Sequence, residues 1–237
     1  MAQPKIFSLM DKAIHEYNLI EKGDKILIGA SGGKDSTALV EYFASRKHQK
    51  RPNDDFEFMA IHIAPGFADH LNPKLVEQFE HWGVDFKTIN IDVLGRLKPG
   101  KKMNCWWCST QRRTELNNYA MEHGYNKIAL GHHLDDILET LLMNALKKGQ
   151  LSTMPPRLKY KKYPVTVIRP LCFATDQSIV DHAEKVGYKK DTTTCTYDDN
   201  STRKKARSRL YALTEGNEHE KLKFFEALRN INTEYLP

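Results

Sequence analysis

The chain has 237 residues, 40% of them hydrophobic, which is enough for one sizeable α/β core with a small appendage and too few for two full domains. No apolar stretch reaches the roughly eighteen residues of a membrane-spanning helix, and the N-terminus lacks a signal-peptide pattern, so we expect a cytoplasmic protein with no membrane partner. The formal net charge of +6 suits an anionic partner such as RNA as well as it suits plain solubility. Basic residues cluster at positions 203–209 and 157–162, and we expect these two clusters to contact RNA phosphates.

Short apolar runs, typical of buried strands, alternate along the chain with longer stretches of helical spacing. We predict strands at residues 25–30, 56–63, 84–91, 127–131 and 165–168. We predict helices at residues 4–20, 36–46, from 72 onward, 108–122, 134–147, 175–187 and beyond 201. This alternation indicates an α/β fold, a parallel five-stranded sheet with helices on both faces, in which ligands bind at the carboxyl ends of the strands.

The remaining segments are polar. Residues 93–104 are expected to form a basic loop and residues 149–164 an exposed loop. We assign residues 1–200, including the short N-terminal helix, to one domain and residues 201–237 to a helical C-terminal extension.

A glycine-rich turn, Ser31-Gly32-Gly33-Lys34-Asp35-Ser36, follows the first predicted strand. Glycines let the backbone approach an anion closely, and the N–H groups at the start of the next helix attract phosphate. Lys34 adds a positive charge, and the two serines add hydroxyl donors. The carboxylate of Asp35 suits a phosphate site only where Mg²⁺ bridges the carboxylate and the phosphates. The spacing is not that of a Walker loop. The alternative interpretation is a plain glycine turn that caps a helix.

A second polar motif, Gly131-His132-His133-Leu134-Asp135-Asp136, follows the fourth predicted strand. Asp135 and Asp136 begin a helix, where carboxylates are favoured, so they could be no more than first-turn charges. They could also complete a Mg²⁺ site that faces Asp35. A metal role for His132 and His133 is weak, because adjacent residues on a strand point to opposite faces.

The two motifs together resemble those of the PP-loop ATPase superfamily, over roughly residues 20–200. The resemblance implies an adenine nucleotide alpha hydrolase-like fold that splits ATP between its α and β phosphates and adenylates an oxygen. We therefore expect nucleotide contacts at the ends of three strands, from Ala30, Ser31, Gly32, Gly33, Lys34, Asp35, Ser36, His62, Ile63, Gly131, His132 and Asp136. We expect catalytic roles for Lys34, Asp35, Arg112 and Asp136, and Mg²⁺ ligation by Asp35 and Asp135.

The chain has four cysteines, Cys105, Cys108, Cys172 and Cys195. Cys105 and Cys108 form a C-x-x-C pair at the start of a predicted helix, and Cys195 lies in a polar loop. Three thiolates could hold three irons of a 4Fe-4S cluster and leave the fourth open. Zinc with Cys172 as fourth ligand, or a redox dithiol with Cys195, are alternatives, although Cys172 has apolar neighbours and is expected to be buried and inert.

Four stretches together resemble the tRNA 2-thiocytidine synthetase family: residues 105–113, 127–140, 154–158 and 168–171. The resemblance implies a 4Fe-4S cluster on Cys105, Cys108 and Cys195, and ATP-dependent insertion of sulfur into a tRNA base at cytidine C2. It also implies a sulfur donor such as a cysteine desulfurase or free sulfide, and leaves a homodimer possible. Alternatives are thiolation of another base or a small molecule, lysidine-type or amide-forming synthesis, and a nucleotide-binding redox sensor.

Overall fold

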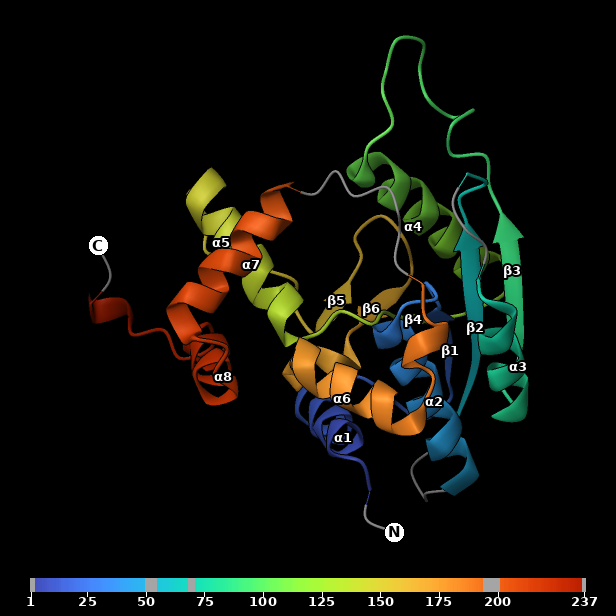
Figure 1. Cartoon of the computed structure of the whole chain (residues 1–237), viewed down its shortest axis with the longest axis horizontal. Coiled ribbons are helices and arrows are strands. Elements are labelled where there is room, and N and C mark those ends of the chain that lie inside the picture. Colours follow the sequence, from blue (N-terminus) through green and yellow to red (C-terminus); the bar gives the residue numbers. More distant parts are fainter. Residues whose placement is uncertain (1–2, 50–54, 68–70, 194–200, 236–237) are drawn as a thin grey trace.

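A twisted, mostly parallel sheet forms the centre of the protein (Figure 1). The computed structural model describes residues 3–49, 55–67, 71–193 and 201–235. The strands are β1 (Asp24–Gly29), β2 (Phe56–Ala64), β3 (Phe86–Asn90), β4 (Lys127–Ala129), β5 (Arg157–Lys159) and β6 (Thr166–Ile168). They are ordered β3-β2-β1-β4-β6-β5, and only β5 among them runs antiparallel to its neighbour. The strand order reverses between β1 and β4, which is where such sheets bind ligands.

The helices follow the strands in the predicted alternation. They are α1 (Lys5–Tyr17), α2 (Lys34–Gln49), α3 (Pro73–His81), α4 (Cys105–Glu122), α5 (Leu134–Lys148), α6 (Asp176–Val186), α7 (Ser201–Thr214) and α8 (Glu218–Ala227). Single 3₁₀ turns lie at Pro170–Phe173, Lys189–Asp191 and Thr233–Tyr235. None of the helices within the described residues is both long enough and apolar enough to cross a membrane.

Alternate residues of β1 belong to two separate hydrophobic clusters, as the two-residue period of a strand requires. Ile26 and Ile28 pack with side chains of α1, α2, α5 and α6, whereas Leu27 packs with Leu116 and Tyr119 of α4. Helices therefore cover both faces of the sheet, as predicted, and α4 lies on the face opposite α2.

Two sequence predictions need correction. Over the described residues the sheet has six strands and not five, because β5 lies inside the segment that was expected to be an exposed loop at residues 149–164. Helix α4 begins at Cys105 and not at residue 108, because the Asn104 side chain caps the helix by accepting a hydrogen bond from the Trp107 N–H at 2.8 Å. Both cysteines of the C-x-x-C pair therefore lie within the first turn of α4.

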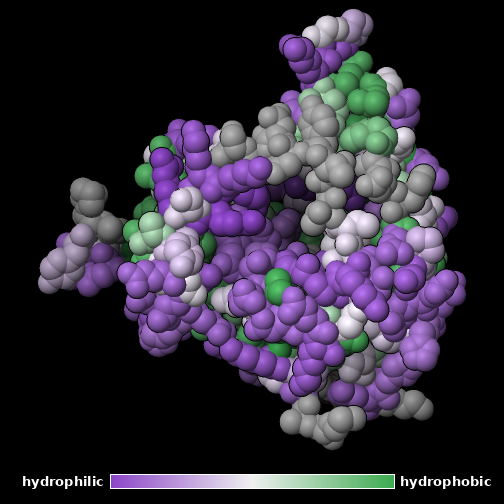
Figure 2. Space-filling model, viewed as in Figure 1, coloured by the Kyte–Doolittle hydropathy of each residue, from purple (hydrophilic) through white to green (hydrophobic). Residues whose placement is uncertain are grey.

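The C-terminal helices α7 and α8 lie beside α5 (Figure 1). Leu210 of α7 and Phe225 of α8 are buried in the same hydrophobic cluster as α1, α2 and α5. Elsewhere α7 is rich in charge, and hydrophilic residues dominate the surface over α6 and α7 (Figure 2). The region beyond residue 201 is thus helical, as predicted, while its separation from residues 1–200 as an extension stays a prediction.

Candidate active site

The glycine-rich turn lies at the carboxyl end of β1 and leads directly into α2. Gly32 has a φ of +87°, and a Cβ at this position would lie 2.7 Å from Leu71 Cδ1 and 2.9 Å from Thr193 Oγ1. Gly33 has no positive φ, and the nearest atom to a Cβ there is Ser31 Oγ at 3.5 Å. Gly32 is therefore the position at which the loop excludes any other residue.

The serine and threonine hydroxyls of the loop bond to the loop itself. Ser36 Oγ accepts a hydrogen bond from the Ser31 N–H at 3.1 Å and donates to the Gly33 carbonyl at 3.0 Å. Thr37 Oγ1 also donates to the Gly33 carbonyl at 3.0 Å. Ser36 is buried. Its hydroxyl holds the turn in shape, and in this arrangement it is less available as a phosphate donor than the sequence suggested.

The two sequence motifs meet at Gly131. A Cβ on Gly131 would lie 2.9 Å from the backbone nitrogen of Ser36 and 3.0 Å from the carbonyl carbon of Asp35. The end of β4 thus passes directly against the first turn of α2, and only glycine permits this approach. The predicted meeting of the two motifs at one edge of the sheet is what the structure shows.

Lys34 lies between two carboxylates. Its ammonium group is 2.7 Å from Asp35 Oδ1 and 2.7 Å from Asp176 Oδ1 at the start of α6. Burial alone would lower the pKa of Lys34, but the two carboxylates outweigh this effect and raise it. Burial would likewise raise the pKa of Asp176, but its hydrogen bond and ion pair with Lys34 lower it. The lysine is therefore fully charged and held at the mouth of the loop.

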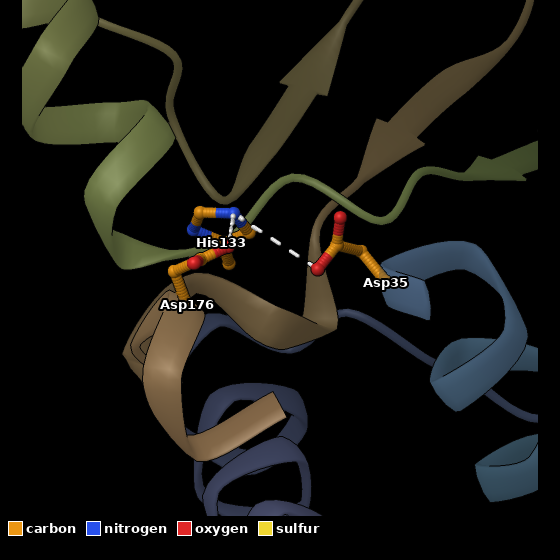
Figure 3. Close-up of side chains that lie close together, drawn as sticks. All are labelled: Asp35, His133 and Asp176. Carbon is orange, nitrogen blue, oxygen red and sulfur yellow. Dashed lines mark ion pairs between the residues drawn. The ribbon is translucent and has the colours of Figure 1, made fainter. Parts of the chain in front are cut away.

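His133 faces the same two carboxylates (Figure 3). Its Nε2 lies 3.4 Å from Asp176 Oδ1 and 4.0 Å from Asp35 Oδ1, and one possible ligand atom from each of the three residues lies within 4.8 Å of the others. His133 was expected to lie on a strand, but it lies in the turn before α5, where it caps that helix in a reciprocal pair with Asp136. The alternation of side chains along a strand therefore gives no reason to exclude a metal role for His133.

Asp135 has other partners. Its carboxylate accepts a hydrogen bond from Lys221 of α8 at 2.6 Å and from the Asp176 backbone N–H at 2.8 Å. The carboxylate that shares Lys34 with Asp35 is that of Asp176, which was not among the predicted site residues. Its only sequence signal was its place at the start of a helix capped by Thr175, which follows the last parallel strand.

Two acids of α5, the half-buried Asp136 and the buried Glu139, bind arginines of α7. Arg203 lies 2.8 Å from Asp136 Oδ1 and 3.4 Å from Glu139 Oε2, and Arg207 Nε lies 2.8 Å from Glu139 Oε1. The Glu139 side chain is fully buried. The basic run from residue 203 to 209 was expected to contact RNA phosphates, but these two arginines instead fasten α7 to α5.

Replacing both Arg203 and Arg207 by methionine should destabilise the fold by about 3 kcal/mol, because Glu139 would keep a buried charge without these partners. Unfolding in urea, followed by circular dichroism, measures the loss. Adding Glu139→Leu to the double variant removes the charge and should restore much of the stability. If the double variant is as stable as the parent protein, these ion pairs do not hold α7 in place.

A cavity of about 200 Å³ lies beside the loop, between the ends of β1, β2 and β4 and the first turns of α4. It is lined by Gly29, Ala30, Ser31, Ile61, Ile63, Ser109, Arg112, Arg113, Leu116, Leu130 and His132. Arg112 Nε donates to the Ile63 carbonyl at 2.8 Å. His62 is not part of the lining, and its Nδ1 instead lies 2.7 Å from the Ala30 carbonyl. His62 and Ile63 were both expected to contact the nucleotide, and only Ile63 lines the cavity.

His132 is held in one protonation state. Arg169 Nε donates a hydrogen bond to His132 Nδ1 at 3.3 Å, and Arg169 is itself fixed by a 2.6 Å bond to the Pro155 carbonyl. Burial, together with the charge of Arg169, lowers the pKa of His132 to about 4. Because arginine can only donate, Nδ1 must accept and the proton lies on Nε2. His132 is therefore a neutral donor at neutral pH.

Cys105 and Cys108 lie within the first turn of α4 and are both half-buried. Trp107 Nε1 donates to the Val93 carbonyl at 3.1 Å, which fixes this turn against the core. Positions three apart on a helix share one face, so two thiols here can bind one metal centre.

Cys172 is fully buried, as expected, and burial raises the pKa of its thiol to about 12. Cys195 lies outside the described residues. The described residues on either side of it are attached to the site: the Thr193 N–H donates to the Gly32 carbonyl at 2.9 Å, and Arg203 binds Asp136. Thr193 and Arg203, the described residues on either side, thus each contact one of the two motifs.

Comparison with known proteins yields one family and a set of relatives. A family model described as a PP-loop domain matches residues 4–213. A tRNA-cytidine(32) 2-sulfurtransferase from Anaeromyxobacter dehalogenans is 37% identical over 190 residues, which cover 78% of this chain and 64% of that protein. The enzyme of the same name from Delftia acidovorans is 41% identical over 179 residues, 73% of this chain and 56% of that protein. The chain thus spans somewhat less than two thirds of the curated relatives it matches.

Two solved structures share the fold. The U34-tRNA thiolase NcsA from Methanococcus maripaludis, solved with its [4Fe-4S] cluster, superposes with a TM-score of 0.73 at 23% identity, over 96% of this chain and 80% of that one. An NH3-dependent NAD synthetase from Campylobacter jejuni gives a TM-score of 0.54 at 13% identity, over 99% of this chain and 90% of that one. At these identities the similarity supports the fold alone.

Proposed function

The chain belongs to the PP-loop domain family, and from this premise we propose that it is an ATP-dependent tRNA sulfurtransferase that replaces the C2 oxygen of a cytidine by sulfur. The observation that carries the proposal is the cysteine pair at the start of α4. Cys105 and Cys108 share the first turn of this helix, and Thr193, the last described residue before the segment with Cys195, donates its N–H to the carbonyl of Gly32 in the glycine-rich loop. The names of the curated relatives support tRNA as the substrate.

ATP would bind with its phosphates at the loop and its base in the neighbouring cavity. The close approach at Gly32 and the charge of Lys34 suit phosphate, and the apolar walls from Ile61 and Ile63 suit a purine. Mg²⁺ prefers oxygen ligands, so Asp35 and Asp176 would bind it once Lys34 turns from them toward the phosphates. Asp135 would keep its structural role.

The reaction needs the base oxygen to become a leaving group. Attack of that oxygen on the α-phosphate forms an adenylated base and releases pyrophosphate. Replacement by sulfide then releases AMP, which carries away the original oxygen. Lys34 would stabilise charge on the phosphates, and the His132 Nε2–H and Arg112 would donate to an oxygen in the cavity. His132 would not act as a base, because its Nδ1 already accepts a hydrogen bond from Arg169 and a pKa of about 4 makes the ring a weak proton acceptor.

Cys105, Cys108 and Cys195 would hold a 4Fe-4S cluster, whose fourth iron would supply the binding site for sulfide. The half-buried pair at a helix start fits such a group, and the buried Cys172 does not. A cysteine desulfurase or free sulfide would be the sulfur source. The reaction would take place in the cytoplasm, where both ATP and tRNA are available. A homodimer is compatible with this function.

The direct test is a reaction with reduced, iron-reconstituted protein, Mg-ATP, sulfide and unmodified tRNA. Mass spectrometry of the digested tRNA should show 2-thiocytidine, with one pyrophosphate released for each sulfur inserted. Pyrophosphate release that requires an amine acceptor and no iron would instead indicate an amide- or lysidine-forming enzyme. ATP binding without turnover in the presence of tRNA would indicate a nucleotide-binding sensor.

Binding of tRNA should weaken steeply as salt rises, because lysines that contact phosphates release counterions. The best candidates are now the exposed lysines of the loop before α4, such as Lys101 and Lys102, since Arg203 and Arg207 are engaged elsewhere. Replacing Lys101 and Lys102 by glutamine should reduce the slope of log K against log salt by about 2, and filter binding at several salt concentrations measures it. Lys22→Gln, at the opposite edge of the sheet, should leave the slope unchanged.

A further inference from the structure

One large aromatic side chain lies exposed beside the cysteine pair. Trp106 occupies the position after Cys105 and is 71% exposed, whereas its neighbour Trp107 donates a hydrogen bond to Val93 and packs against the core. Exposing a tryptophan costs free energy that burial would recover. The Asn104 cap and the buried contacts of Trp107 already fix this turn of α4, so stability does not account for Trp106.

Trp106 lies on the helix stripe that leads to the cavity. Ser109 and Arg113 lie three and seven positions further along α4, which places them on the same face of the helix. Both of them line the cavity beside the glycine-rich loop. A molecule that enters this cavity along α4 therefore passes Trp106.

The surroundings of Trp106 are positively charged. Residues 93–114 contain six basic side chains and no acidic one: Arg96, Lys98, Lys101, Lys102, Arg112 and Arg113. Arg96 is paired with Glu115, but Lys98, Lys101 and Lys102 are exposed. The loop with these lysines, which joins β3 to α4, projects from the body of the protein at the top of Figure 1. An exposed indole next to a projecting basic loop matches the composition of sites that bind single-stranded nucleic acid.

We infer that Trp106 is a stacking platform for an unpaired nucleobase of the RNA substrate, next to the base that reacts with the ATP bound at the cavity. This inference rests on the proposed function for its RNA ligand. Every base has a π-face, so stacking would bind the RNA strand without reading its sequence. The basic loop would bind the adjacent phosphates, and Arg113 would lie between the platform and the cavity. Chemistry on a base requires that base to leave its stack, and an aromatic surface can replace the lost neighbour.

The test compares variants for their binding of an RNA hairpin with an unpaired loop. Trp106→Ala should bind the hairpin about tenfold or more weakly, because base stacking on one aromatic residue commonly accounts for that much. Trp106→Phe should retain most of the affinity. Leu94→Ala removes an exposed apolar side chain of the loop before α4 and should have no effect. The salt slope should stay unchanged in Trp106→Ala, because tryptophan contacts no phosphate.

Two further measurements separate stacking from damage to the site. An RNA duplex of equal length has no unpaired base, and Trp106→Ala should bind it as well as the parent protein does. Iron content and visible absorption should also be equal in the two proteins. Equal affinity of Trp106→Ala and the parent protein for the hairpin overturns the inference and leaves the sulfurtransferase proposal standing. If the parent protein binds no RNA, the proposed function itself fails, and the inference with it.

Discussion

Replacing Gly32 by alanine is expected to weaken ATP binding on the order of a hundredfold, and replacement by valine to abolish it. The residue has a φ of +87°, and a Cβ would meet Leu71 and Thr193 at 2.7 and 2.9 Å. Left-handed backbone costs an L-residue roughly 1–2 kcal/mol before any clash, and about 1.4 kcal/mol is already a tenfold change in affinity. The loop must move, and its N–H groups then no longer converge on the phosphates. Isothermal titration with Mg-ATP measures the effect.

Gly83 provides the matched control, because it also has a positive φ, of +66°, but a Cβ there would have no atom within 4 Å. Gly83→Ala adds backbone strain far from the loop and should leave ATP affinity unchanged. If a folded Gly32→Ala protein binds ATP like the parent protein, the loop is not the phosphate site. Gly33→Ala tests the contact with the anion itself, because the structure has room for a Cβ at this position. A loss of ATP affinity in this variant would show that the phosphates approach the Gly33 backbone closely.

The two sequence motifs meet in the fold, as predicted, but the sequence did not identify every side chain that lies beside them. Strand, glycines and helix follow one another locally, so residues 31–36 were sufficient to predict a phosphate loop. Asp176 could not be predicted in this way, because its partner Lys34 lies 142 positions away and only the fold brings α6 beside α2. The orientation of His62 was missed for a similar reason, since both faces of β2 are buried and its hydrophobic pattern does not say which face meets the cavity.

Charge patterns were the least informative part of the sequence. The basic run in α7 resembled an RNA-binding surface until Arg203 and Arg207 were found bound to Asp136 and Glu139. A buried acid such as Glu139 gives no local signal of its burial. Strand β5 was missed because it has only three residues, two of them basic, and it is defined by its pairing with β6 at the edge of the sheet.

Loss of any one of Cys105, Cys108 and Cys195 to serine is expected to abolish both cluster binding and thiolation. A 4Fe-4S cluster on three thiolates has no spare ligand, so each substitution removes a bond that no other residue replaces. The parent protein, purified without oxygen and reconstituted, should be brown and hold about four irons per chain, which iron analysis and visible absorption measure. The activity readout is 2-thiocytidine in digested tRNA.

Cys172→Ser is the matched control, and it also separates the metal alternatives. Cys172 is fully buried and its thiol has a pKa of about 12, so forming a thiolate there would be costly. The Cys172→Ser protein should therefore retain both its iron and its activity, with at most some loss of stability from the serine hydroxyl in the core. Zinc bound by four cysteines would make Cys172 essential and the protein colourless. A dithiol mechanism would leave activity in protein stripped of metal. If protein treated with a chelator, and free of iron and zinc, still thiolates tRNA, the cluster mechanism is wrong, because no metal is then present to bind the sulfide.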